Sequence, residues 1–254
     1  MPFTFSHPAI VLPLLKTRRK IFSATGLIAG SITPDFESFI KIGERKIYSH
    51  TWLGMFWFDL PLSVVICMVF HLIIRDPLIE NLPKPLEERF SIYNNFNWLS
   101  YFRKNFLIVI ISLLVGIFSH LIWDAFTHLN LHDPDSIRSR IKIWHMRLYI
   151  VLQYVCSLIG MLFILWVVYK LPRRKVKRVA ASNMKFKYWL FVFLLAAFIG
   201  AYLYTDIHEE TEMAAYMHVY VIDFIYMAIS SSLLSLIVVS LLYTYVFRKN
   251  TFIL

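Results

Sequence analysis

Long uninterrupted runs of apolar residues alternate with short polar segments along the whole chain. An α-helix needs about 20 predominantly apolar residues to cross a hydrocarbon layer of about 30 Å. Five runs come close to that length, at 54–74, 106–128, 149–171, 188–204 and 219–247. Because a helix satisfies its backbone hydrogen bonds internally, this pattern predicts an all-α, polytopic transmembrane helix bundle with about five full spans.

Two shorter apolar segments precede the first span. PAIVLPLL at 8–15 and IFSATGLIAGSI at 21–32 are each too short to cross a bilayer, and the turn between them is basic. We expect a hairpin of short helices that packs against the main bundle. Between the first two spans, the polar segment 75–105 contains Pro83 and Pro85, which we interpret as marks of irregular chain.

No internal repeat or low-complexity stretch interrupts this pattern. We therefore expect a single integral-membrane domain over residues 1–254. Within it, residues 1–171 contain the candidate chemistry and form the core of a predicted metal site, and residues 172–254 add a C-terminal helix pair.

The composition agrees with a membrane location, since 58% of the residues are hydrophobic and the mean hydropathy is +0.61. The first residues, MPFTFSH, lack a basic region and a cleavage site of small residues, so we expect no secretory signal peptide. Cys67 and Cys156 both lie inside apolar runs, where a thiol behaves as a small apolar side chain. No disulfide framework or thiolate metal site is expected.

The distribution of the +10 net charge predicts a topology and argues against nucleic-acid binding. Residues 171–187 contain seven Lys or Arg residues, whereas 205–218 contain none. Under the positive-inside rule, 171–187 and the C-terminus are cytoplasmic and 205–218 are external. The same topology places the loop 129–148 outside. The four basic residues of that loop do not fit an external position. The basic run RRKVKR suits anionic head groups, so membrane lipids are expected partners.

Two histidines and an aspartate end the second apolar run. His120, Asp124 and His128 follow one another at four-residue intervals, so they lie on one helical stripe. Ionisable groups cost about 2.5–3.5 kcal/mol each at membrane depth, and imidazole and carboxylate are ligands for zinc and similar ions. His120 and His128 are about 12 Å apart along a helix, which one ion does not span without strain. The alternative is an interfacial polar helix end anchored by Trp123.

A second acidic motif, TPDFE, lies at residues 33–37. Asp35 is a candidate metal ligand, and Glu37 is a candidate ligand or general base. The alternative is a helix start, with Thr33 as cap, Pro34 at the first position and acids favoured by the helix dipole. Both acids reach one ion only if the chain is extended here, because side chains two positions apart in a helix point in nearly opposite directions.

Three further polar residues lie next to or within the apolar runs. His7 and His50 are candidate ligands, although a single histidine beside a membrane is usually interfacial. Asp59 lies inside the first span, where we expect it to form hydrogen bonds with the metal ligands without binding the metal itself.

The combination of these residues is more informative than any one of them. Nitrogen and oxygen ligands suit one or two divalent ions with open coordination positions, zinc first and manganese as the alternative. Water activated by such an ion at a membrane surface would hydrolyse an ester or phosphoester. The candidates are His7, Asp35, Glu37, His50, His120, Asp124 and His128.

Four longer strings occur in order along the chain: MPFTFSHPAIVLPL, AGSITPDFESF, FDLPLSVVICMVFHLIIRDPLI and SHLIWDAFTH. With these strings and the LQYVCSLIG stretch around Gln153, the sequence resembles a bacterial membrane family, domain of unknown function 4184, to about residue 170. The resemblance implies a multi-pass protein of the bacterial cytoplasmic (inner) membrane. We expect Gln153, like Asp59, to contact the metal ligands and not the metal itself.

A more distant similarity bears on mechanism. An N-terminal histidine, a P-D-x-[DE] element, an H-[ST] element and S-H-x-x-x-D on a later helix resemble the inner-membrane metal-dependent hydrolases. That family in turn looks related to zinc-dependent phospholipase C. In this sequence one departure is clear, since the H-R-G-x-T-H-S element of those hydrolases is reduced to YSHT. The resemblance implies metal ligands at His7, Asp35, His50, His120 and Asp124, with Glu37 as a further ligand or base.

The leading hypothesis is a metal-dependent membrane hydrolase that acts on a lipid or envelope ester or phosphoester near the external face. Glu37 or Asp124 would accept the proton of the water. A non-enzymatic transporter is the alternative, because intramembrane His and Asp residues also mark ion paths. A transport path should continue across the bilayer, whereas these candidates gather at one end. A structural role in envelope assembly, with the polar residues joining helices, is the third hypothesis.

Overall fold

A computed structural model describes residues 3–16, 21–43, 46–127, 141–143, 145–174, 182–210 and 217–248. Five of its helical segments are long and apolar enough to cross a membrane: Met55–Asn81, Phe106–Thr127, Leu148–Lys170, Asn183–Thr205 and Asp223–Val246. The only strands among the described residues form a two-stranded hairpin. The prediction of an all-α bundle with about five spans is therefore confirmed.

The chain divides into two compact units. The first comprises Met1–Phe36, Ile47–Cys67 and Leu99–Leu171, and the second comprises Glu37–Lys46, Met68–Trp98 and Pro172–Leu254. The segments 37–46 and 68–98 thus group with the C-terminal helices. The organisation as a single membrane domain stays a prediction.

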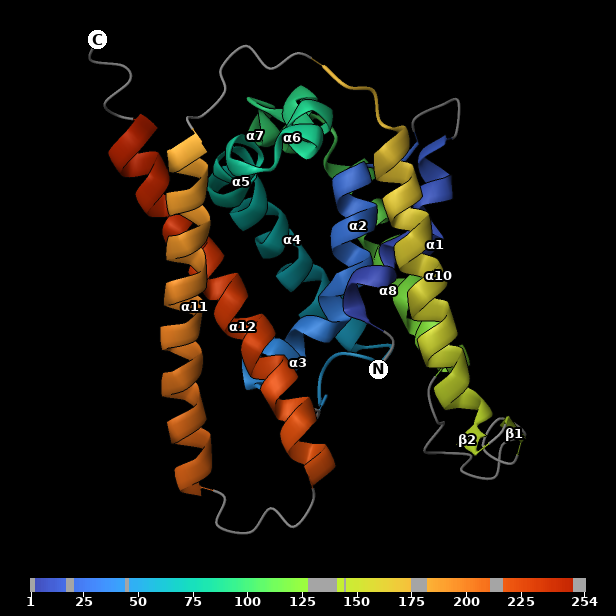
Figure 1. Cartoon of the computed structure of the whole chain (residues 1–254). Coiled ribbons are helices and arrows are strands. Elements are labelled where there is room, and N and C mark those ends of the chain that lie inside the picture. The colour runs from blue at the N-terminus through green and yellow to red at the C-terminus, as the bar shows by residue number, and fades with distance from the viewer. Residues whose placement is uncertain are drawn as a thin grey trace. The chain divides into compact units, whose positions relative to one another are not determined.

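The first unit begins with the expected hairpin of short helices, and the long helices follow it in the chain. Four of its helices, α1, α2, α8 and α10, run beside one another (Figure 1). The N-terminal elements are η1 (Thr4–Ser6), α1 (Pro8–Val11), η2 (Leu12–Lys16), α2 (Ala24–Ile32) and η3 (Thr33–Asp35). The later ones are a π-helical turn η4 (Met55–Asp59), most of α4 (Leu60–Val69), most of α7 (Trp98–Lys104), α8 (Phe106–Thr127), α10 (Leu148–Lys170) and the hairpin β1 (Lys142–Ile143) with β2 (Met146–Arg147).

Glycine residues let α2 and α8 approach until their backbones touch. A Cβ atom added to Gly30 would lie 2.2 Å from the Leu113 carbonyl oxygen, and one added to Gly116 would lie 2.5 Å from the Leu27 carbonyl oxygen. Side chains of any size would force the helices apart, as at other membrane helix crossings built on small residues. This close crossing fixes the positions of His120 and Asp124 on α8 relative to the end of α2.

The second unit contains α3 (Phe36–Lys41), the π-helical turn η5 (Phe70–Ile74), α5 (Arg75–Asn81), α6 (Lys84–Phe90), η6 (Ser91–Tyr93), α11 (Ser182–Glu210), α12 (Met217–Tyr243) and the π-helical turn η7 (Thr244–Arg248). Helices α11 and α12 lie side by side (Figure 1). Hydroxyl groups join them, since Ser235 Oγ donates to the Val192 carbonyl over 2.6 Å and Tyr188 Oη lies 2.9 Å from Ser240 Oγ.

The segment 75–105 is more regular than the sequence predicted. Helices α5, α6 and α7 occupy most of it. Pro83 is the N-cap of α6 and Pro85 lies in its first turn. Proline is tolerated at a helix start because the first amide groups have no partner inside the helix, so the two prolines begin a helix rather than exclude one.

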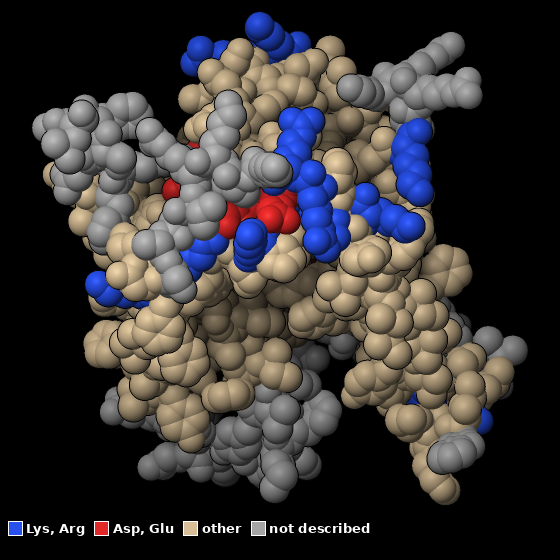
Figure 2. All heavy atoms as spheres, turned by 45° about the horizontal axis from the view of Figure 1, so that its top comes forward, with Lys and Arg blue, Asp and Glu red and all other residues tan. Residues whose placement is uncertain are grey.

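Acidic and basic side chains lie close together on one face of the protein (Figure 2). Figure 2 shows Lys and Arg side chains around a group of acidic ones on one face, next to surfaces of uncharged residues. In the second unit the buried carboxylate of Glu87 pairs with Lys185, whose amine also donates to the Leu82 carbonyl over 2.9 Å. The buried Glu87 carboxylate thus has a cationic partner, as the low dielectric of a helix bundle requires.

Candidate metal centre

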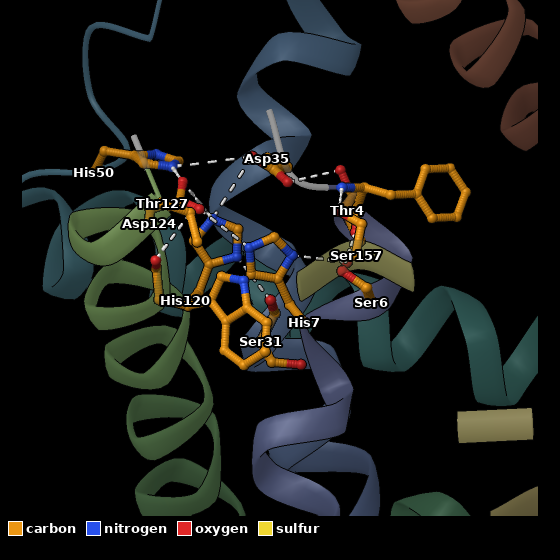
Figure 3. A network of polar contacts seen from close by, with 12 residues as sticks. Thr4, Ser6, His7, Ser31, Asp35, His50, His120, Asp124, Thr127 and Ser157 are labelled. Carbon is orange, nitrogen blue, oxygen red and sulfur yellow. Dashed lines mark hydrogen bonds and ion pairs between the residues drawn. The ribbon is translucent and has the colours of Figure 1, made fainter. Parts of the chain in front are cut away.

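Four side chains from three parts of the first unit converge at one end of α8. His120 and Asp124 come from the last two turns of α8, Asp35 from the end of η3, and His50 from the loop that precedes η4. One ligand atom from each residue lies within 4.8 Å of the ligand atoms of the other three (Figure 3). We call these four residues the ligand group, since together they could hold a metal ion.

The distances between these atoms fit the size of a metal site. His50 Nε2 lies 3.0 Å from Asp124 Oδ2 and 3.2 Å from His120 Nε2. His120 Nε2 lies 3.3 Å from Asp124 Oδ2 and 3.6 Å from Asp35 Oδ1, and His50 Nε2 lies 3.9 Å from Asp35 Oδ1. Zinc bonds of about 2.0–2.1 Å in tetrahedral geometry place neighbouring ligand atoms about 3.3–3.4 Å apart. The five distances scatter around that value.

Hydrogen bonds on the far side of the rings determine which nitrogen faces the ligand group. His120 Nδ1 donates to the Ser31 carbonyl over 2.8 Å. A carbonyl oxygen only accepts, so the proton of a neutral His120 resides on Nδ1 and its Nε2 offers a lone pair. His50 Nδ1 lies 3.1 Å from Ser49 Oγ. Metal-binding histidines are typically oriented in this way by a partner on the second nitrogen.

The contacts inside the ligand group favour positive charge. Two imidazole Nε2 atoms face each other and two carboxylates, and carboxylates are acceptors only. Lone pairs that face lone pairs at about 3 Å repel, and burial in a low dielectric strengthens the repulsion. A divalent cation, or protons on the rings, removes it. The donor set of two imidazoles and two carboxylates therefore fits a divalent ion such as zinc.

His7 lies directly beside this group. Its ring stacks on His120, with centroids 4.0 Å apart and an interplanar angle of 15°. Its Nδ1 donates to the Thr4 carbonyl over 3.1 Å, and its Nε2 lies 3.2 Å from Asp124 Oδ1. Asp124 thus contacts the ligand group with Oδ2 and His7 with Oδ1. His7 is not one of the four mutually close residues, and it contacts the group through Asp124 Oδ1.

Thr4 is a site residue that sequence reasoning missed. Its hydroxyl donates to Asp35 Oδ2 over 2.6 Å, which leaves Oδ1 toward the ligand group (Figure 3). Its carbonyl accepts the His7 hydrogen bond, so one buried residue orients two side chains. The segment is tied to α10, where Ser157 Oγ accepts the Phe3 amide over 2.9 Å. No signal in MPFTFSH separates this threonine from an ordinary hydroxyl residue.

The backbone around His50 is unusual. His50 has a φ of 62°, in the left-handed region that non-glycine residues seldom occupy. A Cβ atom at Gly54 would lie 1.8 Å from the Tyr48 carbonyl oxygen, so the loop closes tightly against its own backbone. Such conformations persist only where the surrounding structure determines them, and they gather at functional sites.

The other predicted site residues have different surroundings. The chain is helical through η3 and α3, and the buried carboxylate of Glu37 pairs with Lys41, whereas Asp35 faces the ligand group. Asp59 is fully buried in η4. Gln153 is half-buried in α10, and His128 lies outside the described residues.

Comparisons with known proteins identify a family but no characterised relative. No curated protein and no solved structure matched the chain. A family model described as domain of unknown function (DUF4184) matches residues 1–241. That match covers the N-terminal segment, α2, α8 and the C-terminal helix pair, so the chain belongs to the family of domain of unknown function 4184.

Proposed function

We propose that this protein is a metal-dependent hydrolase of the membrane that cleaves an ester or phosphoester of a lipid or other envelope amphiphile. The observation that carries the proposal is the ligand group itself. Two imidazole nitrogens and two carboxylate oxygens lie within 4.8 Å of one another at the end of a helix long and apolar enough to span a membrane. Buried ionisable groups are costly in a membrane, and they are retained where function uses them.

Zinc is the ion that we propose, with manganese as the alternative. His50, His120, Asp35 and Asp124 would hold it through His50 Nε2, His120 Nε2, Asp35 Oδ1 and Asp124 Oδ2. When bound there, a divalent ion supplies Lewis acidity, which activates a water nucleophile and stabilises charge on an ester or phosphoryl oxygen. Borderline nitrogen and oxygen ligands favour zinc over calcium or magnesium.

A side chain of the protein would accept the proton that the attacking water loses. Asp124 Oδ1 points away from the ligand group to His7 Nε2, 3.2 Å away. We assign the acceptance of the water proton to the Asp124 carboxylate, with His7 orienting it. Glu37, the other base that the sequence offered, pairs with Lys41 and is the less suitable candidate.

The position of the group along α8 suits a substrate at the membrane surface. At about 1.5 Å per residue, Asp124 lies about 5 Å and His120 about 10 Å from the helix end at Thr127. We propose that the group lies where lipid head groups meet the acyl chains. From the charge distribution we propose the external face of the bacterial inner membrane for the site and the cytoplasm for the C-terminus.

Metal content tests the proposal. The protein is purified in detergent, and bound metals are measured by mass spectrometry in the wild type, His120→Ala and Asp124→Asn. His145→Ala, at an exposed histidine of the β1–β2 turn, is the control. We expect near-stoichiometric zinc or manganese in the wild type and the control, and its loss from the two ligand variants. Wild-type protein that stays metal-free after reloading would rule the hydrolase out.

A structural ion-binding role is the second candidate. Four protein ligands already complete a tetrahedral zinc site, which is typical of structural rather than catalytic centres. Hydrolysis of phospholipids by the zinc-loaded wild type, absent in Asp124→Asn, would favour the enzyme. Zinc that raises thermal stability without any hydrolysis would favour the structural role.

A further inference from the structure

The four side chains of the ligand group differ in their exposure, and His50 is the most accessible of them. The side chains of Asp35 and His120 are 1% and 0% exposed, and that of Asp124 is 9% exposed. His50 is 21% exposed, the most of the four. A substrate that reaches the group therefore passes His50 and the loop that carries it.

That loop is covered with exposed apolar side chains. We call residues 47–57 the aromatic segment, since Tyr48, Trp52, Phe56 and Trp57 belong to it. Trp52 is 69% exposed and Leu53 is 78% exposed, close behind His50 in sequence. A contiguous apolar surface of this kind marks contact with a membrane or a partner. Trp and Tyr are the residues enriched where a bilayer meets water.

The aromatic segment is continuous with the lipid-facing side of α8. The Trp52 ring lies 6.1 Å from the ring of Phe118. Phe118, Ile122 and Phe126 follow at four-residue intervals and are 42%, 36% and 67% exposed. An exposed apolar stripe on a helix long and apolar enough to cross a membrane suits contact with acyl chains, and the aromatic segment touches this stripe through Trp52. The occupant of the surface is the bilayer.

We infer that the aromatic segment inserts into the lipid interface and that the metal centre opens to the bilayer. Its substrate is then an amphiphile with an ester or phosphoester head group, which enters past His50 from the plane of the membrane. The identity of the substrate class rests on the proposed hydrolase, whereas the insertion of the segment does not. The two parts can be tested separately.

Fluorescence quenching tests the insertion. The protein is reconstituted in nanodiscs of phosphatidylcholine and phosphatidylglycerol in equal parts, with or without acyl chains brominated near the head group. The difference between wild type and Trp52→Phe reports the emission of Trp52. We expect bromolipid to quench this emission and aqueous iodide to have no effect on it. Trp98→Phe removes a tryptophan that is 2% exposed and serves as the reference for a shielded ring. Quenching by iodide alone would overturn the inference.

Substrate presentation tests the access route. The zinc-loaded protein is assayed on phosphatidylglycerol in nanodiscs and on a water-soluble phosphodiester, bis-p-nitrophenyl phosphate. We expect Trp52→Gln to lower the rate on the lipid at least tenfold with unchanged zinc content. Trp166→Gln, at a 47% exposed tryptophan of α10, should keep the wild-type rate.

The outcomes separate the two proposals. Faster cleavage of the soluble diester than of the lipid, with no effect of Trp52→Gln, would refute entry from the bilayer and leave the hydrolase intact. Cleavage of neither probe by zinc-loaded protein would contradict the proposed function. The quenching result would then decide the insertion by itself.

Discussion

Replacement of Gly116 by alanine should weaken metal binding without touching any ligand. The added Cβ would lie 2.5 Å from the Leu27 carbonyl oxygen and 2.8 Å from the Ser31 amide nitrogen. An ordinary contact needs at least 3.4 Å, so α2 must retreat from α8 by roughly 1 Å. The hydrogen bond from His120 Nδ1 to the Ser31 carbonyl, now 2.8 Å, would lengthen past the limit for such bonds.

The size of the effect follows from the loss of that hydrogen bond. Partners that orient a metal-binding histidine are typically worth about 10–100-fold in metal affinity. Overpacking of the crossing should also cost about 1–3 kcal/mol of stability. We expect zinc affinity, measured by competition with a chromophoric chelator in detergent, to fall within that range while the helical circular dichroism is kept.

Gly200→Ala is the matched control for this prediction. A Cβ atom there would lie 3.5 Å from Ser231 Oγ, an ordinary contact in a helix–helix interface. Alanine is favoured over glycine in a helix by about 0.5–1 kcal/mol, so this variant should be slightly stabilised and bind zinc as the wild type does. A folded Gly116→Ala protein with wild-type zinc affinity would refute the idea that the α2–α8 crossing positions His120.

Three further predictions concern the site and its support. Thr4→Val should lower zinc affinity about 10–100-fold because Asp35 Oδ2 loses its 2.6 Å hydrogen bond, whereas Thr4→Ser should restore it in the same competition assay. Lys185→Met should leave the buried Glu87 carboxylate without its cation and cost about 3–5 kcal/mol in thermal or denaturant unfolding, at unchanged zinc content. Removal of zinc by a chelator should lower the stability by about 2.7 kcal/mol relative to protein held at 100 times the dissociation constant, and a melting temperature that does not change would contradict metal binding to the folded state.

Local patterns in the sequence predicted the helices of this protein and part of its chemistry. The apolar runs predicted five helices long enough to span a membrane, because hydropathy and length are properties of each segment alone. The spacing of His120 and Asp124 placed both on one face of α8, since helical periodicity is equally local. The N-terminal hairpin followed from two apolar segments too short to span. The prolines at 83 and 85 were misread, because proline both interrupts a helix and begins one.

Periodicity did not join the polar residues of different segments; the resemblance to the inner-membrane metal-dependent hydrolases implied such a set, and the tertiary structure shows which of its members lie together. His7 meets Asp124 across 117 residues of sequence, and His50 meets His120 across 70. No periodicity reaches that far, and these contacts depend on a backbone crossing at Gly30 and Gly116 and on a left-handed turn at His50. The sequence by itself determined which segments are helical and which polar side chains share one helix. The packing of those helices determined that Asp35 faces the ligand group, because each interhelical contact depends on the shapes of both partners.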